Sequence, residues 1–207
     1  ERRMRARPLA LASLTITVVA LLSACGSDHG AQPSAAISGS SGRAADIAFA
    51  QLMIPHHRQA IEMADLAPTR ASSPQVKALA AQIKAAQDPE IAQMTVWLKS
   101  WGAPSAMPGS DSSGMPGDDH SSMDMGGVPV SGMMSAQTMD ELEAATGQEF
   151  DRLWQQYMIG HHRGAIEMAN QVLKASQDDA VKKLAQQIIT AQQAEIDTMT
   201  ANFEGSH

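Results

Sequence analysis

Apolar residues recur at helical spacing in two blocks of the chain. In the first block an i, i+4, i+7, i+11 rhythm begins at Met53, and a second run of the same kind extends from Val76 to Leu98. The segment between them, APTRASSPQ at residues 67–75, contains two prolines and two serines and predicts a turn. We therefore expect the block to form a helical hairpin with one apolar stripe on each helix.

The whole block occurs twice. Residues 51–95 match residues 156–200 at 23 of 45 positions without a gap, and the pair includes MIPHHRQAIEMA and MIGHHRGAIEMA. A hairpin of amphipathic helices cannot bury its apolar stripe alone. We therefore predict an all-α, ferritin-like four-helix bundle in which the two hairpins face each other. Aromatic residues make up only 3% of the chain, so its core must consist mainly of Ala, Leu, Ile, Val and Met.

The first residues resemble a bacterial lipoprotein signal. Four arginines precede the apolar run LALASLTITVVALL, and LSAC ends it at Cys25, the one cysteine of the chain. Cleavage before Cys25 and lipidation of its thiol would tether the protein to a membrane outside the cytoplasm. A transmembrane anchor is the alternative, although the run is short for a span of about 20 residues.

Composition changes divide the rest of the chain. The formal net charge of −7 argues against a nucleic-acid partner, which favours a basic face. Small polar residues predict flexible segments without a core. The predicted parts are a signal peptide (1–24), a flexible tether (25–43), the first hairpin (44–101), a Met- and His-rich flexible crossover (102–137) and the second hairpin (138–207).

On a helical wheel, the two adjacent histidines of each repeat share the face that must be buried, together with two methionines and an aspartate. These residues are Asp46, Met53, His56, His57 and Met63 in the first repeat, and Asp151, Met158, His161, His162 and Met168 in the second. Asp46 could equally be an N-cap. The second helix of each hairpin places on its apolar stripe Glu90 and Met94, or Glu195 and Met199. A buried carboxylate is costly unless it is paired, and antiparallel packing brings Glu90 close to His57.

This combination predicts a soft metal site. Neutral imidazole and thioether sulfur coordinate soft cations, and a glutamate can orient an imidazole by accepting its other N–H. Thioethers favour Cu(I), or Ag(I) as its mimic, over zinc, calcium or magnesium. The predicted ligand pool is Met53, His56, His57, Met63, Met94, Met158, His161, His162, Met168 and Met199, supported by Asp46, Glu90, Asp151 and Glu195. A buried His–Glu network without metal is the alternative.

The crossover adds further candidate ligands. The stretch MPGDDHSSMDMGG contains Met115, His120, Met123 and Met125, and four more methionines lie nearby at Met107, Met133, Met134 and Met139. In a segment without a core, these side chains suggest an arm that captures copper. A linker of biased composition is the alternative.

The doubled pattern D-x-x-F/W-x-x-x-M-I-x-H-H-x-x-A-I-x-M-A, at residues 46–64 and 151–169, resembles the bacterial domain of unknown function numbered 305. The resemblance covers roughly residues 44–203 without the crossover. It implies a ferritin-like four-helix bundle and an association with copper outside the cytoplasm, but no general activity.

Together, the residues and the resemblance predict an extracytoplasmic lipoprotein that binds Cu(I) for tolerance, storage or delivery, with no catalytic residues. Its expected partners are the metal ion and the membrane, the latter through lipid on Cys25. Two other classes stay open. A di-iron oxidase would use the glutamates and histidines, but neither Glu90 nor Glu195 has a histidine three residues on. An interaction module would keep the polar core for structure alone.

Overall fold

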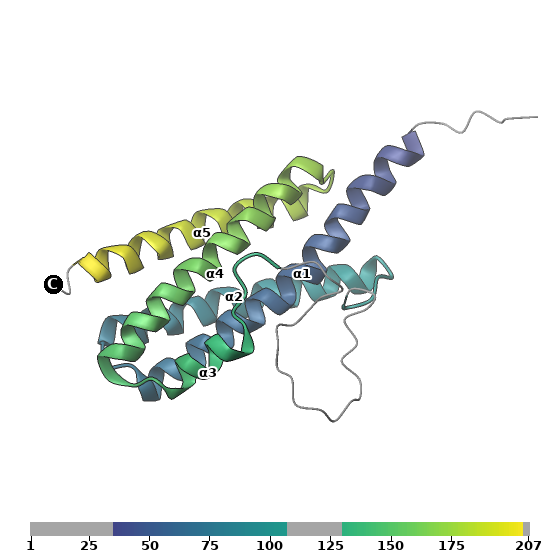
Figure 1. Cartoon of the computed structure of the whole chain (residues 1–207). Helices are drawn as coiled ribbons and strands as arrows, with labels where there is room; N and C mark the ends of the chain where they lie inside the picture. Colours follow the sequence, from purple (N-terminus) through teal and green to yellow (C-terminus); the bar gives the residue numbers. More distant parts are fainter. Residues whose placement is uncertain (1–34, 107–129, 205–207) are drawn as a thin grey trace, which may run out of the picture. The chain divides into compact units, whose positions relative to one another are not determined.

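Four long helices and one short helix make up the part of the chain that the computed structural model describes, residues 35–106 and 130–204 (Figure 1). The helices are α1 (Ala35–Arg70), α2 (Pro74–Ser100), α3 (Ala136–Ala144), α4 (Gly147–Ala175) and α5 (Asp179–Glu204). Within these ranges no strand is formed, and the only bridge joins Ala71 to Gly147. The prediction of an all-α fold is confirmed.

Local sequence signals fix where several helices begin. The Ser73 hydroxyl accepts a hydrogen bond from the Val76 amide, and Pro74 follows it at the first helical position of α2. Ser135 caps α3 in the same way by accepting from the Thr138 amide at 3.2 Å. Asp178 caps the start of α5, since its carboxylate accepts a hydrogen bond from the Ala180 amide at 2.9 Å.

The long helices pair as two hairpins, α1 with α2 and α4 with α5, and α1 packs along α4 to join them. Buried residues form two hydrophobic clusters. One cluster contains Phe150 and Trp154, and the Trp154 indole donates to the Met63 carbonyl across the hairpin interface at 3.0 Å. The other contains Phe49 and Ile188. Each cluster draws on both hairpins, so neither hairpin has a complete core alone.

Three boundaries differ from the prediction. α1 begins at Ala35, inside the expected tether. At the end of that tether Arg43 pairs with Asp46 and Asp178 and lies 4.4 Å from the Trp101 ring centroid. α1 also continues through Pro68 to Arg70, so the turn is only residues 71–73. The third difference is α3, which begins at the end of the expected crossover and extends into the expected second hairpin.

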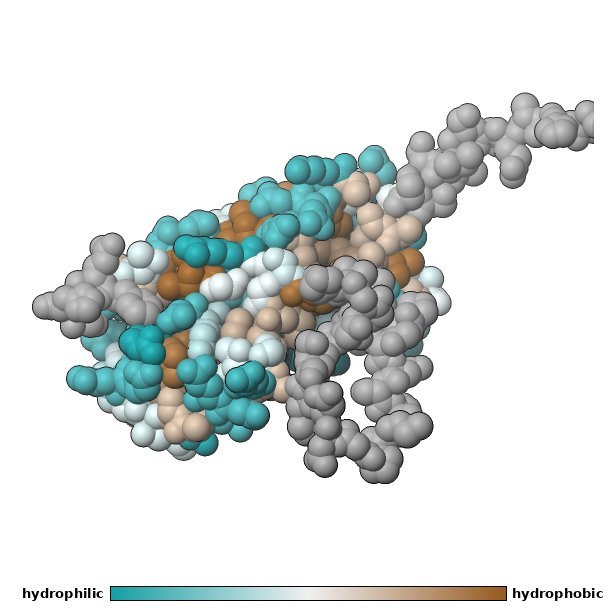
Figure 2. Space-filling view, in the orientation of Figure 1, coloured by the Kyte–Doolittle hydropathy of each residue, from teal (hydrophilic) through white to brown (hydrophobic). Residues whose placement is uncertain are grey.

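The described surface is mostly polar. On the face shown in Figure 2, hydrophilic and neutral residues dominate and brown patches are small. Val96 is the only large hydrophobic residue exposed in the described ranges. Among the described helices, none combines the length and the apolar character that crossing a bilayer requires. The described residues all belong to one compact unit, Pro33–His207.

Candidate metal centre

The packing of α1 against α4 brings the two histidine pairs together in the core. His56, His57, His161 and His162 are all fully buried. His56 and His161 come from equivalent positions of the two repeats, and their ring centroids are 3.7 Å apart. The HH pairs that lie 105 residues apart in sequence therefore form one imidazole layer.

Each hairpin ties one of its histidines to a glutamate. His57 Nε2 lies 2.7 Å from Glu90 Oε2, and His162 Nε2 lies 2.7 Å from Glu195 Oε2. Because a carboxylate only accepts, Nε2 carries the proton in the neutral ring and Nδ1 keeps its lone pair. In both rings Nδ1 is buried without a hydrogen-bond partner. The geometry therefore leaves two basic nitrogens free in the core.

The other histidine of each repeat, His56 or His161, does not follow the symmetry of the two hairpins. His56 Nε2 lies 3.2 Å from the Ser131 carbonyl, to which it donates, and its Nδ1 is buried without a partner. Neither ring nitrogen of His161 has a well-formed hydrogen bond. A buried nitrogen without a partner costs about 1–3 kcal/mol. The same cost applies to the side-chain amides of Gln87 and Gln192, which are buried and unpartnered.

Burial keeps two of these imidazoles neutral. Desolvation lowers the pKa of His56 to about 3, with a further contribution from His57 that outweighs the opposing hydrogen bond to Ser131. Desolvation also lowers the pKa of His161 well below its usual value, helped by the neighbouring histidines and weakly opposed by the backbone of His56. At neutral pH both rings therefore present lone pairs rather than charge.

Six buried methionines lie on both sides of the imidazole layer. Three of them belong to the hydrophobic cluster that contains Phe150, and we call them the first methionine cluster: Met63, Met158 and Met199. The other three belong to the hydrophobic cluster that contains Phe49, and we call them the second methionine cluster: Met53, Met94 and Met168. Along α1 the histidines lie between Met53 and Met63, and thus between the two clusters. Each methionine cluster takes two members from one repeat and one from the other.

The predicted roles of the two aspartates are wrong, because the structure places both away from the histidines. The Asp151 carboxylate accepts from the Ser72 hydroxyl and from the Ser73 amide at 2.9 Å, so it holds the turn between α1 and α2. Asp46 lies inside α1, where it pairs with Arg43, and is not an N-cap. A helical wheel gives the face of a residue but not its height, and Asp46 lies roughly 15 Å along α1 from His56.

The remaining predicted residues are only partly described. Met115, His120, Met123, Met125 and Cys25 lie outside the described residues. Met134, in the predicted crossover, and Met139, just after it, pack partly buried against the core.

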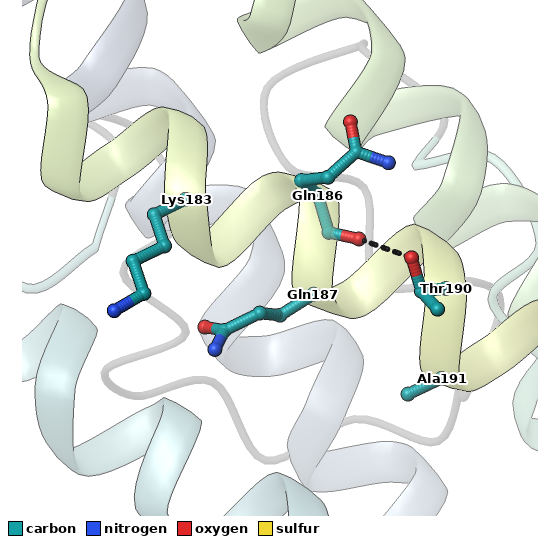
Figure 3. Close-up of a pocket in the computed structure, with 5 residues that line it drawn as sticks. All are labelled: Lys183, Gln186, Gln187, Thr190 and Ala191. Atoms are coloured by element: carbon teal, nitrogen blue, oxygen red, sulfur yellow. Dashed lines mark hydrogen bonds between the residues drawn. The ribbon is translucent and has the colours of Figure 1, made fainter.

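The described residues contain no group of three or more His, Cys, Asp or Glu side chains arranged to hold a metal ion. Asp46 and Asp151, which a carboxylate-rich di-iron centre would need, are paired with Arg43 and with the turn at Ser73. A surface hollow on α5, shown in Figure 3, contains none of the candidate ligands. Its lining residues are Lys183, Gln186, Gln187, Thr190 and Ala191.

Sequence reasoning missed the contribution of residues 130–135 to this centre. The Ser131 carbonyl contacts His56, and the Gln59 side chain holds the Met134 backbone through bonds of 2.9 and 2.7 Å. A backbone carbonyl leaves no signal in residue type. The one available signal was the difference between the two copies of the motif at Gln59 and Gly164.

Comparison with known proteins places this arrangement in a family. Residues 46–203 match the sequence profile of the domain of unknown function DUF305. The chain belongs to this family. No curated protein sequence matches it.

Solved structures of DUF305 proteins share the fold of this chain. A presumed secreted DUF305 protein from Streptomyces coelicolor is 28% identical with a TM-score of 0.64, covering 75% of this chain and 89% of its own. A DUF305 fragment from Deinococcus radiodurans is 29% identical with a TM-score of 0.63, covering 76% and 93%. CopM in its Cu(I)-bound form is 29% identical with a TM-score of 0.60, covering 78% and 97%. CopM also has Cu(II)-bound and Ag-bound structures.

Proposed function

We propose that this DUF305 protein binds Cu(I), with Ag(I) as a mimic, through buried imidazole and thioether groups in its bundle. The observation that carries the proposal is the pair of free Nδ1 atoms on His57 and His162, each in a ring that a glutamate orients through Nε2. Metal-binding histidines usually have their other ring nitrogen held in this way. If the core bound no ligand, these buried nitrogens would stay without a hydrogen-bond partner, which would cost free energy of folding.

The chemistry of the neighbouring groups favours a soft monovalent cation. Thioethers bind Cu(I) well and compete poorly for zinc, calcium or magnesium. The low pKa of His56 keeps its imidazole available for a metal at neutral pH. Methionine is also a soft ligand that persists outside the cytoplasm, where cysteine is readily oxidised. The copper-bound and silver-bound forms of CopM support the same choice of metal.

The two methionine clusters suggest two ions per bundle. Cu(I) takes few ligands, so the ten predicted ligands exceed the needs of one ion. Each cluster supplies three thioethers, and the imidazole layer lies between the clusters. We assign one ion to each methionine cluster, with imidazole nitrogens completing both ligand sets. The glutamates orient the rings rather than bind the metal.

The place of action in this proposal is outside the cytoplasm. The LSAC motif at Cys25 and the apolar run before it support export and lipid attachment. The description of the Streptomyces relative as a presumed secreted protein agrees with export. Copper tolerance, storage or delivery fits a binding protein at this location. Replacing Cys25 with Ser should release the protein from the membrane fraction, and unchanged retention would contradict the anchor.

Anaerobic titration with Cu(I) against a competing chelator tests the metal site. A His57→Ala/His162→Ala variant should lose at least tenfold in affinity, about 1.4 kcal/mol per ion. The matched control is Arg58→Ala/Arg163→Ala, which alters the exposed residue beside each histidine. Normal binding by the histidine variant would assign these rings to core structure alone.

A further inference from the structure

The two copies of the HH motif differ at only two of twelve positions. MIPHHRQAIEMA becomes MIGHHRGAIEMA, so that Pro55 and Gln59 in α1 correspond to Gly160 and Gly164 in α4. The structure relates the second difference, Gln59 against Gly164, to one segment, residues 130–135, which we call the strap. In Figure 1 the strap is the teal loop that precedes α3 and passes between α4 and α1.

Gly164 allows the strap to touch α4 directly. A Cβ at Gly164 would lie 1.9 Å from the Ser131 carbonyl oxygen and 2.4 Å from its carbon, distances that no side chain can accept. The strap in turn adopts φ of +84° at Gly132, where a Cβ would meet the Gly160 carbonyl oxygen at 2.8 Å. By contrast, a Cβ at Gly160 would meet nothing within 4 Å. Gly164 is thus the position on α4 where a side chain would displace the strap.

The other helix holds the strap by hydrogen bonds. Gln59 donates to the Met134 carbonyl at 2.9 Å and accepts from the Met134 amide at 2.7 Å. On the α4 side, the Ser131 hydroxyl donates to the exposed Glu167 carboxylate at 2.8 Å. The two copies of the motif have therefore diverged in complementary ways, one to clamp the strap and the other to make room for it.

The strap contacts the imidazole layer through the Ser131 carbonyl. Ser131 is exposed to solvent, yet its carbonyl accepts from Nε2 of the fully buried His56. At this point one residue separates solvent from the adjacent, tilted rings of His56 and His161. The helices around the layer are held by large apolar contacts, whereas the strap is held by a few hydrogen bonds and the partly buried side chains of Val130 and Met134. Segments of this second kind open at a much lower free energy than the core.

We propose that the strap gates the exchange of metal between solvent and the imidazole layer. Closed, it covers His56 and holds that ring through the Ser131 carbonyl. Opening breaks the bonds to Gln59 and Glu167 and exposes the imidazole pair while the helices stay packed. The gate rests on the proposed function, because it presumes that metal binds at this layer. It concerns the rate of exchange, whereas the proposed function concerns binding at equilibrium.

The two glycines of α4 provide a matched test. Gly164→Ala must push the strap away, and Gly160→Ala makes the same change one turn earlier in open space. Both replacements favour the helix to a similar degree, so that effect cancels in the comparison. Release of Cu(I) from the loaded full-length protein to excess bathocuproine disulfonate is followed by stopped flow. We expect Gly164→Ala to release Cu(I) at least tenfold faster, with unchanged stoichiometry, and Gly160→Ala to match the wild type.

A second variant keeps the test decisive if Gly164→Ala does not fold. Gln59→Leu preserves the approximate shape of the side chain and removes both bonds to Met134. Hydrogen exchange at the Met134 amide, measured without metal, reports opening of the strap independently of copper. Faster amide exchange together with faster Cu(I) release supports the gate.

Two results overturn the gate alone. One is faster amide exchange at Met134 with release of Cu(I) at the wild-type rate. The other is a folded Gly164→Ala variant that binds less Cu(I), which would show that the strap builds the site instead. If the wild-type protein binds no Cu(I), the proposed function falls and the gate falls with it.

Discussion

His56 and His161 occupy the same position in the two repeats, and their rings meet in the core with centroids 3.7 Å apart. A pseudo-twofold relation between the hairpins must therefore pass near this contact. Groups on one side of the imidazole layer then have equivalents on the other, as the His57–Glu90 and His162–Glu195 pairs show. A metal site on one side of the imidazole layer should likewise have an equivalent metal site on the other side.

The first prediction tests the two methionine clusters separately. Leucine has nearly the volume of methionine but no sulfur, so the replacements should cost little stability. We expect Met53→Leu/Met94→Leu/Met168→Leu to lower the Cu(I) stoichiometry from two to one, and the equivalent change at Met63, Met158 and Met199 to do the same. Anaerobic titration with elemental analysis measures the stoichiometry. Met139→Leu in α3 is the control, and two ions in both triple variants would refute the assignment.

The second prediction concerns the glutamates. Glu90→Gln/Glu195→Gln keeps an acceptor near each Nε2 but removes the negative charge beside each ring. Changes of this kind typically cost 10- to 100-fold in metal affinity, so we expect roughly a tenfold loss in competition titrations. Asp88→Asn/Asp197→Asn, which alters exposed carboxylates on the same two helices, should have no effect. Equal affinities for the two variants would leave the glutamates without a role in binding.

The third prediction separates Asp151 from the metal site. Asp151→Ala removes the acceptor for Ser72 and Ser73, and an unsatisfied amide costs about 1–3 kcal/mol. We expect the free energy of unfolding of the metal-free protein to fall by that amount in urea denaturation. Cu(I) affinity, measured below the unfolding transition, should stay the same. A lower affinity would return Asp151 to the binding site.

The fourth prediction is a pH dependence of the metal-free protein. Burial lowers the pKa of His56 to about 3 in the folded state, whereas the unfolded chain has about 6.5. Below pH 6.5 the unfolded state therefore binds a proton that the folded state does not, and stability falls as the pH decreases toward 3. His161 acts in the same direction.

Each of these two histidines should contribute up to about 1.4 kcal/mol per pH unit in that window. His57, His162 and the glutamates paired with them face the same layer. The difference between the wild type and a His56→Gln/His161→Gln variant isolates the two rings. Parallel curves for both proteins between pH 6.5 and 4 would contradict the burial argument.

Much of this structure follows from periodicity. The internal repeat and the 3.6-residue rhythm predict long amphipathic helices, and the wheel correctly buries all four histidines and six methionines. On the same wheel Gln51 falls opposite Met53, which predicts exposure to solvent, but that expectation is wrong. Gln51 is buried because the chain after α2 folds back and offers the Pro104 carbonyl at 2.9 Å. Contacts from outside the helix decide such positions, and periodicity does not contain them.

The candidate site was predicted only in part for similar reasons. The glutamates were found because antiparallel pairing fixes which residues lie opposite each other. The prediction for the two aspartates is wrong because a helical wheel shows the face of a residue but not its position along the helix axis. The strap was missed because Ser131 acts through its backbone, and nothing in its side chain points to His56.

The central claim, a copper site made of buried imidazoles and thioethers, is tested most directly by X-ray absorption at the copper K edge. The sample is the full chain loaded anaerobically with Cu(I), with Met107, Met115, His120, Met123 and Met125 all replaced by Ser so that they cannot contribute. The account predicts stably bound Cu(I) with both sulfur and nitrogen in its first coordination shell. A shell without sulfur, or the loss of bound copper from this variant, would contradict it.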